Sequence, residues 1–395
     1  RRSILSVSAT ALAAMCMVLL FSYIRGVENN LKENILTYYT GQVRIRNKDY
    51  DKNEQMNPLH LNIGSFEKVA RIIDGIPGVS AVSPRISFPA AIYREDEKFV
   101  AMGLGVDFDR ERLFQDLDGK ILEGSLPKTG RNEVLLGSGL AREIGVGLGD
   151  KITLISTTMR RSINAITFTV TGIAGFPEAA FDKKYFLAPI DRAQHFLRMG
   201  DSVIETLIKL TDGTSEVKTE EALNAAFREA GLTDITARAW THIDTSLSIM
   251  KLGTAVFNFI ALFFFLLAST VIINTTMMVI FERTREIGTI GAMGMTGGEI
   301  VRLFFLEAAY LGFLGSLIGC ILGALLTLPL SVTGINVGAV LEGMTFEISD
   351  IVYPALDFAR TVQVFFFSFI IAALSSLIPS RRAARIKPVE ALRSL

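Results

Sequence analysis

The chain alternates between long uncharged apolar stretches and segments with an ordinary globular pattern. A helix needs roughly 20 apolar residues to cross the ~30 Å hydrocarbon core of a membrane. Four stretches reach this length, at residues 4–24, 252–281, 308–341 and 361–380. The third includes an extra apolar segment beyond Pro329. The pattern therefore predicts four transmembrane helices, within residues 1–25, 251–281, 303–330 and 361–380.

The first apolar stretch also has features of a signal peptide. Arg1 and Arg2 precede it, and small residues occur at 11–14. Its uncharged length exceeds a usual signal core, however, and Arg25 follows it where a small-residue cleavage site would be needed. An uncleaved span is the favoured interpretation, and a cleaved signal is the alternative.

Residues 26–250 form the long globular segment between the first two spans. Residues 26–40 continue the first helix as a stalk, because apolar residues recur there at helical spacing. Two helix-and-strand groups follow, and they are far apart in sequence. The first comprises strands at 42–46, 79–91 and 98–106 with a helix at 66–76, and the second comprises strands at 205–210 and 234–239 with a helix at 215–230. Together they predict a split ferredoxin-like α+β subdomain.

Residues 107–204 separate these two groups and are rich in turn signals such as Asp118-Gly119 and Gly149-Asp150. Strands are expected at 133–136, 151–156 and 166–173, with short helices at 138–144 and 189–199. The segment is therefore predicted to be a β-rich inserted subdomain. The expected fold class is a membrane protein with four transmembrane α-helices and an extracytoplasmic α+β domain.

A polar segment at 282–302 lies between the second and third apolar stretches. Its residues predict a short helix at 282–293, broken at Gly294. Thr296 and Glu299 then have the spacing of a capping box at the start of the next helix. A segment with this much internal order is expected to contact another molecule. The alternative is a solvated charged turn, stabilised by Glu/Arg pairs three or four residues apart.

The distribution of charge predicts the orientation in the membrane. Lys and Arg favour the cytoplasmic side of short loops. They gather in three places, at Arg1 and Arg2, at Arg283, Arg285 and Arg302, and at Arg381, Arg382, Arg385, Lys387 and Arg393. The loop at 331–360 is mainly acidic. Both termini and the 282–302 segment are thus expected in the cytoplasm, and residues 26–250 outside.

Composition excludes several other classes of function. The 40 basic and 40 acidic residues balance, so no nucleic-acid-binding surface is indicated. The two cysteines, Cys16 and Cys320, both lie in predicted spans, and the three histidines are far apart. No catalytic, metal-binding or cofactor-binding residues are therefore predicted. The sequence has no Gly-x-x-x-x-Gly-Lys-Ser/Thr phosphate loop, so any ATP is expected to bind a partner.

Several motifs, in this order, resemble one family. Residues 282–288 read Glu-Arg-Thr-Arg-Glu-Ile-Gly and precede a glycine-rich loop, and residues 303–307 lead into a glycine-rich third span. Residues 379–393 form a basic C-terminal motif, and residues 132–150 are similar to the family's outer core. Across essentially its whole length the chain resembles the bacterial ABC-transporter permeases of the MacB/FtsX type.

This resemblance implies a mechanical role. Such permeases form dimers, each resting on a cytoplasmic ATPase that binds ATP and Mg²⁺. The 282–302 segment would be the coupling loop that contacts this ATPase, through Glu282, Arg283, Arg285, Glu286 and Met293. ATPase closure would be relayed to the outer domain, a mode called mechanotransmission. The chain departs from the family pattern at Gly291, Gly297, Gly298 and Glu299, which leaves Arg283 and Arg285 as the expected anchors.

The third span carries small residues at regular spacing. Gly315, Gly319 and Gly323 repeat every four residues, and Gly312 belongs to a neighbouring small-residue stripe. Such stripes let membrane helices pack closely. They are predicted to serve either packing within one subunit or the dimer interface. Glu307, near the cytoplasmic end of the same span, is expected to snorkel to the membrane surface.

The expected function is that of the Lol-type subgroup, which extracts lipoproteins from the bacterial inner membrane. The expected partners are a lipoprotein substrate and a periplasmic carrier. The stalk at 26–40 suits this subgroup. One alternative is mechanical export of a peptide, toxin or drug. A further alternative is the regulation of a cell-wall hydrolase.

Overall fold

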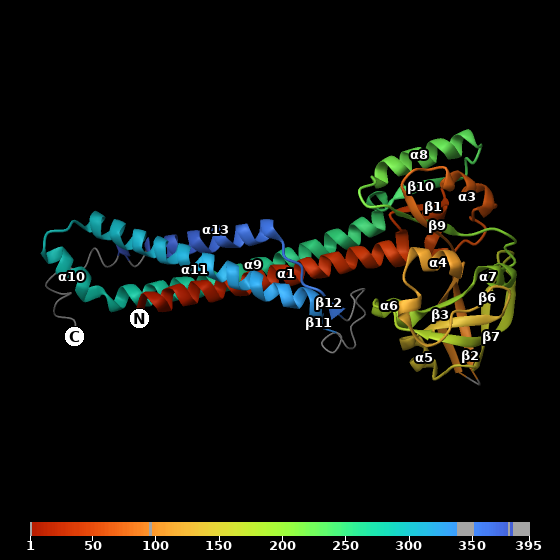
Figure 1. The fold of residues 1–395 in the computed structure, drawn as a ribbon, viewed down its shortest axis with the longest axis horizontal. Coiled ribbons are helices and arrows are strands. Elements are labelled where there is room, and N and C mark those ends of the chain that lie inside the picture. The colour runs from red at the N-terminus through yellow and green to blue at the C-terminus, as the bar shows by residue number, and fades with distance from the viewer. Residues whose placement is uncertain (1, 95–96, 338–350, 378–379, 382–395) are drawn as a thin grey trace. The chain divides into compact units, whose positions relative to one another are not determined.

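The computed structural model describes residues 2–94, 97–337, 351–377 and 380–381 (Figure 1). The chain divides into two compact units. The membrane unit consists of Arg1–Asn29, Lys251–Asn336 and Ile351–Leu395, and the outer unit consists of Asn30–Met250 and Val337–Asp350. The predicted C-terminal motif at 379–393 and the tail at 381–395 lie outside the described residues, apart from Ser380 and Arg381.

Among the described residues, four helices are long and apolar enough to cross a membrane, as the sequence predicted. They are α1 (Arg2–Asn34), α9 (Asp244–Glu282), α11 (Gly297–Thr333) and α13 (Phe358–Ser375). Pro329 does not end α11, which continues one turn further to Thr333. The two short strands β11 (Ile335–Asn336) and β12 (Ile351–Val352) then pair antiparallel.

The membrane unit has a core formed by α1, α11 and α13. Its buried members are Ala14, Met17, Val18, Phe21, Ile24, Cys320 and Val364. Helix α9 contributes little to it, since its apolar side chains such as Leu252 (68% exposed) and Phe259 (71% exposed) are uncovered in the single chain. An apolar helix surface left uncovered in this way must face lipid or another protein chain.

One sheet runs through the outer unit. In the described residues it contains ten strands in the order β10-β1-β9-β2-β3-β8-β5-β7-β4, with β6 paired to β2 and β7. The strands are β1 (Val43–Asn47), β2 (Val79–Arg94), β3 (Glu97–Val106), β4 (Ile121–Gly124), β5 (Glu133–Gly137), β6 (Lys151–Thr157), β7 (Ile163–Ala174), β8 (Tyr185–Pro189), β9 (Glu205–Leu210) and β10 (Ile235–Ala239).

The end of this sheet formed by β10-β1-β9-β2 is the split ferredoxin-like subdomain that the sequence predicted. Helix α3 (Phe66–Asp74) connects β1 to β2, and α8 (Glu216–Glu229) connects β9 to β10. Both helices bury an apolar stripe against one face of the sheet, and in α8 this stripe includes Leu223 and Phe227. Figure 1 shows α3 and α8 beside these strands.

The chain between the two halves of this subdomain continues the same sheet, because β3 lies between β2 and β8. Its helices are α4 (Phe108–Phe114), α5 (Ser138–Ile144), α6 (Ala179–Lys184) and α7 (Ile190–Leu197). Helices α4 and α6 and strands β4 and β8 were not predicted from the sequence. Helix α4 is only two turns long, and Asp107 caps it by accepting hydrogen bonds from Asp109 and Arg110. Such short elements depend on local capping and tertiary packing more than on periodicity.

Short elements complete the outer unit. They are the π-helix η1 (Ile35–Thr40), α2 (Tyr50–Asn53) and the 3₁₀ turns η2 (Glu54–Met56), η3 (Asp118–Lys120) and η4 (Trp240–His242). Helix α1 runs directly into η1, which confirms the predicted helical stalk at 26–40. Gly41 ends it with φ +62°, a conformation that favours glycine. A Cβ at Gly41 would also approach Ile208 backbone atoms to 2.9 Å.

Candidate functional site

The predicted coupling segment is a helix–turn–helix connection between α9 and α11. Helix α9 ends at Glu282, and α10 (Thr284–Ala292) begins after a single non-helical residue, Arg283. The predicted helix at 282–293 is therefore interrupted at Arg283, while the predicted break at Gly294 is confirmed by its φ of +102°. The segment is thus a defined short helix held between two longer ones.

Thr296 and Glu299 form the predicted capping box at the start of α11. The Glu299 carboxylate accepts hydrogen bonds from the Thr296 backbone N–H at 2.8 Å and from its hydroxyl at 2.7 Å. This arrangement fixes the direction in which the chain enters α11. The orientation of α10 relative to α11 is therefore set by local hydrogen bonds as well as by Gly294.

Arg283 forms an ion pair within the chain. Its Nη1 lies 2.5 Å from Glu307 Oε1, and the two side chains are 19% and 34% exposed. Glu307 therefore has a cationic partner, which the expectation of snorkelling did not include. The pair connects the start of α10 to the third turn of α11. A charged interaction at partial burial is stronger than one at a fully exposed surface.

The other predicted coupling residues lie along the same short connection. Glu282 ends α9, Arg285 and Glu286 belong to α10, and Met293 follows α10 with 76% of its surface exposed. Glu286 is exposed too. An exposed thioether beside exposed charges is a typical protein-contact surface. The assignment of these residues to ATPase coupling stays a prediction.

The glycine face of α11 is occupied by helices of the same chain. A Cβ at Gly315 would lie 2.8 Å from Thr10 Cβ, and one at Gly323 would lie 2.8 Å from Val18 Cβ. Gly319 faces Ala11 and Ala14 in the same way, and Gly312 faces Ala372 of α13. These contacts bring the α1 and α13 backbones close to α11, as small residues permit in membrane helices.

The outer unit contains a polar cluster that the sequence analysis missed. We call it the stalk joint, and it consists of Thr37, Tyr38, Arg85 and Glu111. Arg85 donates hydrogen bonds to the backbone carbonyls of Tyr38 and Thr37, each at 2.9 Å. Its Nη2 also lies 2.6 Å from Glu111 Oε1, and both side chains are fully buried. The carbonyls at the end of a helix need such donors, so Arg85 fastens the stalk to strand β2.

Further polar groups satisfy the Glu111 carboxylate. Gln115 donates to it at 2.6 Å, and the Ser83 hydroxyl donates to its other oxygen. A fully buried ion pair persists only when hydrogen bonds satisfy both partners in this way. The sequence held one signal of the joint, namely a single arginine in the otherwise uncharged stretch 79–91. Its partner, Glu111, could not be identified because α4 was not predicted.

Lys120 borders the stalk joint and predicts a pH dependence. Its ammonium lies 5.1 Å from the Tyr38 ring centre and donates to Gln115. Burial lowers the pKa of Lys120 to about 8 from its ordinary 10.5. Between these values the unfolded chain binds more protons than the folded chain, so stability rises with pH. We expect the free energy of unfolding of the outer unit to increase by up to about 3 kcal/mol from pH 8 to 10.5.

This increase is measurable through Trp240, the only tryptophan, which lies in the outer unit. Unfolding of the full chain in lipid nanodiscs is followed by its fluorescence between pH 7.5 and 10.5, for the wild type and Lys120→Met. The difference between the two proteins isolates Lys120 from other titrating groups. Parallel pH profiles for the two proteins would contradict this assignment.

Comparisons with known proteins agree with this architecture. Residues 3–226 match the MacB-like periplasmic core domain, and residues 258–388 match the FtsX-like permease C-terminal domain. The lipoprotein-releasing system transmembrane protein LolC of Neisseria meningitidis is 22% identical over 99% of this chain and 94% of its own length. The corresponding LolE of Haemophilus influenzae is 23% identical over 97% of this chain and 92% of its own length.

A third relative is the macrolide export ATP-binding/permease protein MacB of Nitrobacter winogradskyi. It is 29% identical over 66% of this chain and 38% of its own length. The first family model alone covers more than half of the chain, including most of the outer unit. The second covers the later membrane helices. The chain therefore belongs to the family of ABC-transporter permeases that combine a MacB-like periplasmic core domain with an FtsX-like permease domain.

Proposed function

We propose that this chain is the permease subunit of a lipoprotein-releasing ABC transporter in the bacterial inner membrane. A separate cytoplasmic ATPase binds and hydrolyses ATP with Mg²⁺, and the permease itself carries out no chemistry. Its helices relay the ATPase motion to the outer unit, which draws a lipoprotein out of the membrane. A periplasmic carrier then accepts the released lipoprotein.

The observation that carries this proposal is the similarity to LolC and LolE, which extends over nearly the whole of this chain and of both relatives. The substrate is taken from the names of these relatives. The sequence adds one point, because its 395 residues contain no phosphate loop of their own. The proposal therefore places ATP hydrolysis on a partner.

The structure supports a mechanical relay. Helices α1 and α9 each contain residues of both units without a break in the helix. The stalk joint holds η1, which continues the first of these helices, against β2 through hydrogen bonds of the buried Arg85 side chain. The uncovered apolar surface of α9 suits a second permease subunit, either an identical copy or a homologue. The arginines of the 282–302 segment favour its position in the cytoplasm, with both termini.

Release of a lipoprotein tests the proposal. The permease is reconstituted in liposomes with its ATPase and a fluorescently labelled triacylated lipoprotein, and an excess of a soluble lipoprotein acceptor is added. ATP is expected to transfer the lipoprotein to the acceptor, whereas ADP leaves it in the membrane. Release at equal rates with ATP and ADP, or no release with ATP, would contradict the proposal.

Mechanical export of a peptide, toxin or drug is the second candidate. The 29% identity to a macrolide exporter favours it, although this match covers a smaller part of both chains. The same liposomes distinguish the two functions, because an exporter would move a labelled macrolide or peptide with ATP and leave the lipoprotein in the membrane.

A further inference from the structure

A cavity of about 410 Å³ lies in the outer unit between the end of the stalk and the sheet. Its walls come from η1, from β1 to β3 and from the α2–η2 segment, and they include Arg44, Tyr50 and Met102. Cavities that bind small molecules usually enclose about 300–1,000 Å³, with mostly apolar walls and a few fixed polar groups. This cavity fits that description, since tyrosine, methionine, leucine and isoleucine side chains form its apolar walls. Its charged lining residues are two buried arginines, Arg44 and Arg46, and two carboxylates, Glu54 and Glu205.

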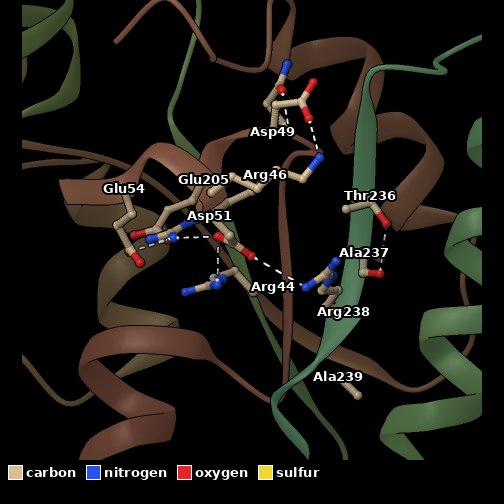
Figure 2. Close-up of polar contacts among 12 residues, drawn as sticks. Arg44, Arg46, Asp49, Asp51, Glu54, Glu205, Thr236, Ala237, Arg238 and Ala239 are labelled. Atoms are coloured by element: carbon tan, nitrogen blue, oxygen red, sulfur yellow. Dashed lines mark hydrogen bonds and ion pairs between the residues drawn. The ribbon is translucent and has the colours of Figure 1, made fainter. Parts of the chain in front are cut away.

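The two arginines differ in how well their charges are compensated. Arg46 lies 2.7 Å from Glu205, 2.8 Å from Glu54 and 3.0 Å from Asp51 (Figure 2). Arg44 lies 3.1 Å from Asp51, and this is the one hydrogen bond that its guanidinium makes within the described part of the chain. Asp51 is also 3.8 Å from Arg238, so one carboxylate serves three guanidinium groups.

Arg44 is therefore the undercompensated cation of the cluster. Its side chain is 8% exposed, and it lines the cavity. Burial, followed by the positive charge of Arg46, lowers the pKa of Arg44 even though Glu205, Asp51 and Glu54 act in the opposite direction. For Arg46 the balance is reversed, because Glu205 and Glu54 raise its pKa in spite of burial. Within the described residues, no guanidinium nitrogen of Arg44 is both sealed from solvent and without a partner, so its remaining N–H groups are accessible to solvent, and Arg44 lines the cavity. A guanidinium presents these donors in a planar fork that matches a carboxylate.

We propose that this cavity binds a small organic acid, whose carboxylate pairs with Arg44 and whose apolar body lies against Tyr50 and Met102. Figure 2 shows the Arg44 guanidinium directed toward Asp51 beside the better-paired Arg46. Such a ligand would contact both η1 and the sheet, and would therefore bridge the stalk end and the strands. The site is independent of which substrate the transporter moves.

Binding of para-trifluoromethylbenzoate tests this site. The full chain in lipid nanodiscs is titrated with the compound, and its fluorine NMR signal is compared with that in empty nanodiscs. A dissociation constant of about 1 mM or lower is expected for a ligand of this size. The neutral amide of the same acid is expected to bind at least about tenfold more weakly, because it lacks the charge that pairs with Arg44.

Three variants locate the site. Arg44→Gln removes the charge, and Met102→Phe places a larger, rigid ring where the apolar body of the ligand would lie, without changing charge. Each is expected to weaken benzoate binding by about tenfold or more. Arg71→Gln, at an exposed position on α3, is the matched control and is expected to bind as the wild type does. If Arg44→Gln fails to fold, the affinity of Met102→Phe shows whether the compound binds in this cavity.

Two results would overturn the proposal. One is the absence of any binding beyond that of empty nanodiscs. The other is equal affinity in the wild type and in the folded Arg44→Gln or Met102→Phe protein, which would place the compound elsewhere. Neither result bears on lipoprotein release, so the two proposals stand or fall separately.

Discussion

Glu111→Ala is expected to destabilise the outer unit by about 3–5 kcal/mol, because it leaves the buried Arg85 guanidinium without its counter-charge. Both side chains are fully buried, and Nη2 of Arg85 lies 2.6 Å from the carboxylate. Loss of the carboxylate also leaves the Ser83 hydroxyl and the Gln115 amide without their hydrogen-bond acceptor. A double variant, Arg85→Met with Glu111→Ala, removes both charges and is expected to recover part of this loss.

The measurement is urea unfolding of the full chain in nanodiscs, followed by the fluorescence of Trp240 in the outer unit. Arg112→Ala is the matched control. Arg112 is the next residue of the same helix, and its ion pair with Asp118 is exposed, so its loss is expected to leave the unfolding free energy nearly unchanged. Equal unfolding curves for Glu111→Ala and Arg112→Ala would contradict the role assigned to the joint.

Gly319→Val is expected to separate α11 from α1 in the membrane unit. A Cβ at this position would overlap the Ala11 carbonyl oxygen and would lie 2.8 Å from Ala14 Cβ. Backbone atoms cannot turn aside as a flexible side chain can, so the helices must move. Overpacking of this kind costs about 1–3 kcal/mol, and more where backbone must shift.

Cys320, the neighbouring residue, reports the separation. Its side chain is buried in the wild type, whereas Cys16 is exposed and is replaced by serine in the background used for labelling. N-ethylmaleimide is expected to label Cys320 about tenfold faster or more in Gly319→Val, since each 1.4 kcal/mol of destabilisation raises an open population tenfold. The control is Gly298→Ala in the same helix, where an added Cβ meets no atom within 4 Å. Equal labelling rates in the two variants would refute tight packing at Gly319.

Much of the fold could be predicted because its signals are local. Uninterrupted apolar length identifies the four spans, and the order of helices and strands identifies the split ferredoxin-like subdomain. Thr296 and Glu299 predict their capping box from spacing alone, since both residues lie within one helical turn. The position of the β-rich segment within the same sheet could not be predicted from local signals. It depends on the parallel pairing of β3 with β8, which join residues some 80 positions apart.

The charged contacts could not be predicted for the same physical reason. Arg283 pairs with Glu307 on another helix, and Arg85 pairs with Glu111 on the unpredicted α4. Each pairing is decided by the tertiary arrangement of two elements, which no periodicity in the sequence encodes. Arg44 illustrates this point, because its alternation with Val43 and Ile45 predicts only that it lies on the opposite face of β1. That this face is buried follows only from the structure.

We propose that a separate ATPase drives the outer unit through the 282–302 segment. The direct test is the number of lipoproteins released per ATP hydrolysed, measured in liposomes that contain the permease and its ATPase. The test variant replaces Arg283, Arg285 and Glu286 by glutamine, together with Glu307→Gln so that no carboxylate is left unpaired. Arg71→Gln, at an exposed position on α3 outside this segment, is the control.

We expect the quadruple variant to hydrolyse ATP while its release per ATP falls by about tenfold or more, as loss of a central interface contact implies. The Arg71→Gln protein should retain the wild-type ratio. Wild-type release per ATP in the quadruple variant, or full release by the permease without any ATPase, would contradict the account.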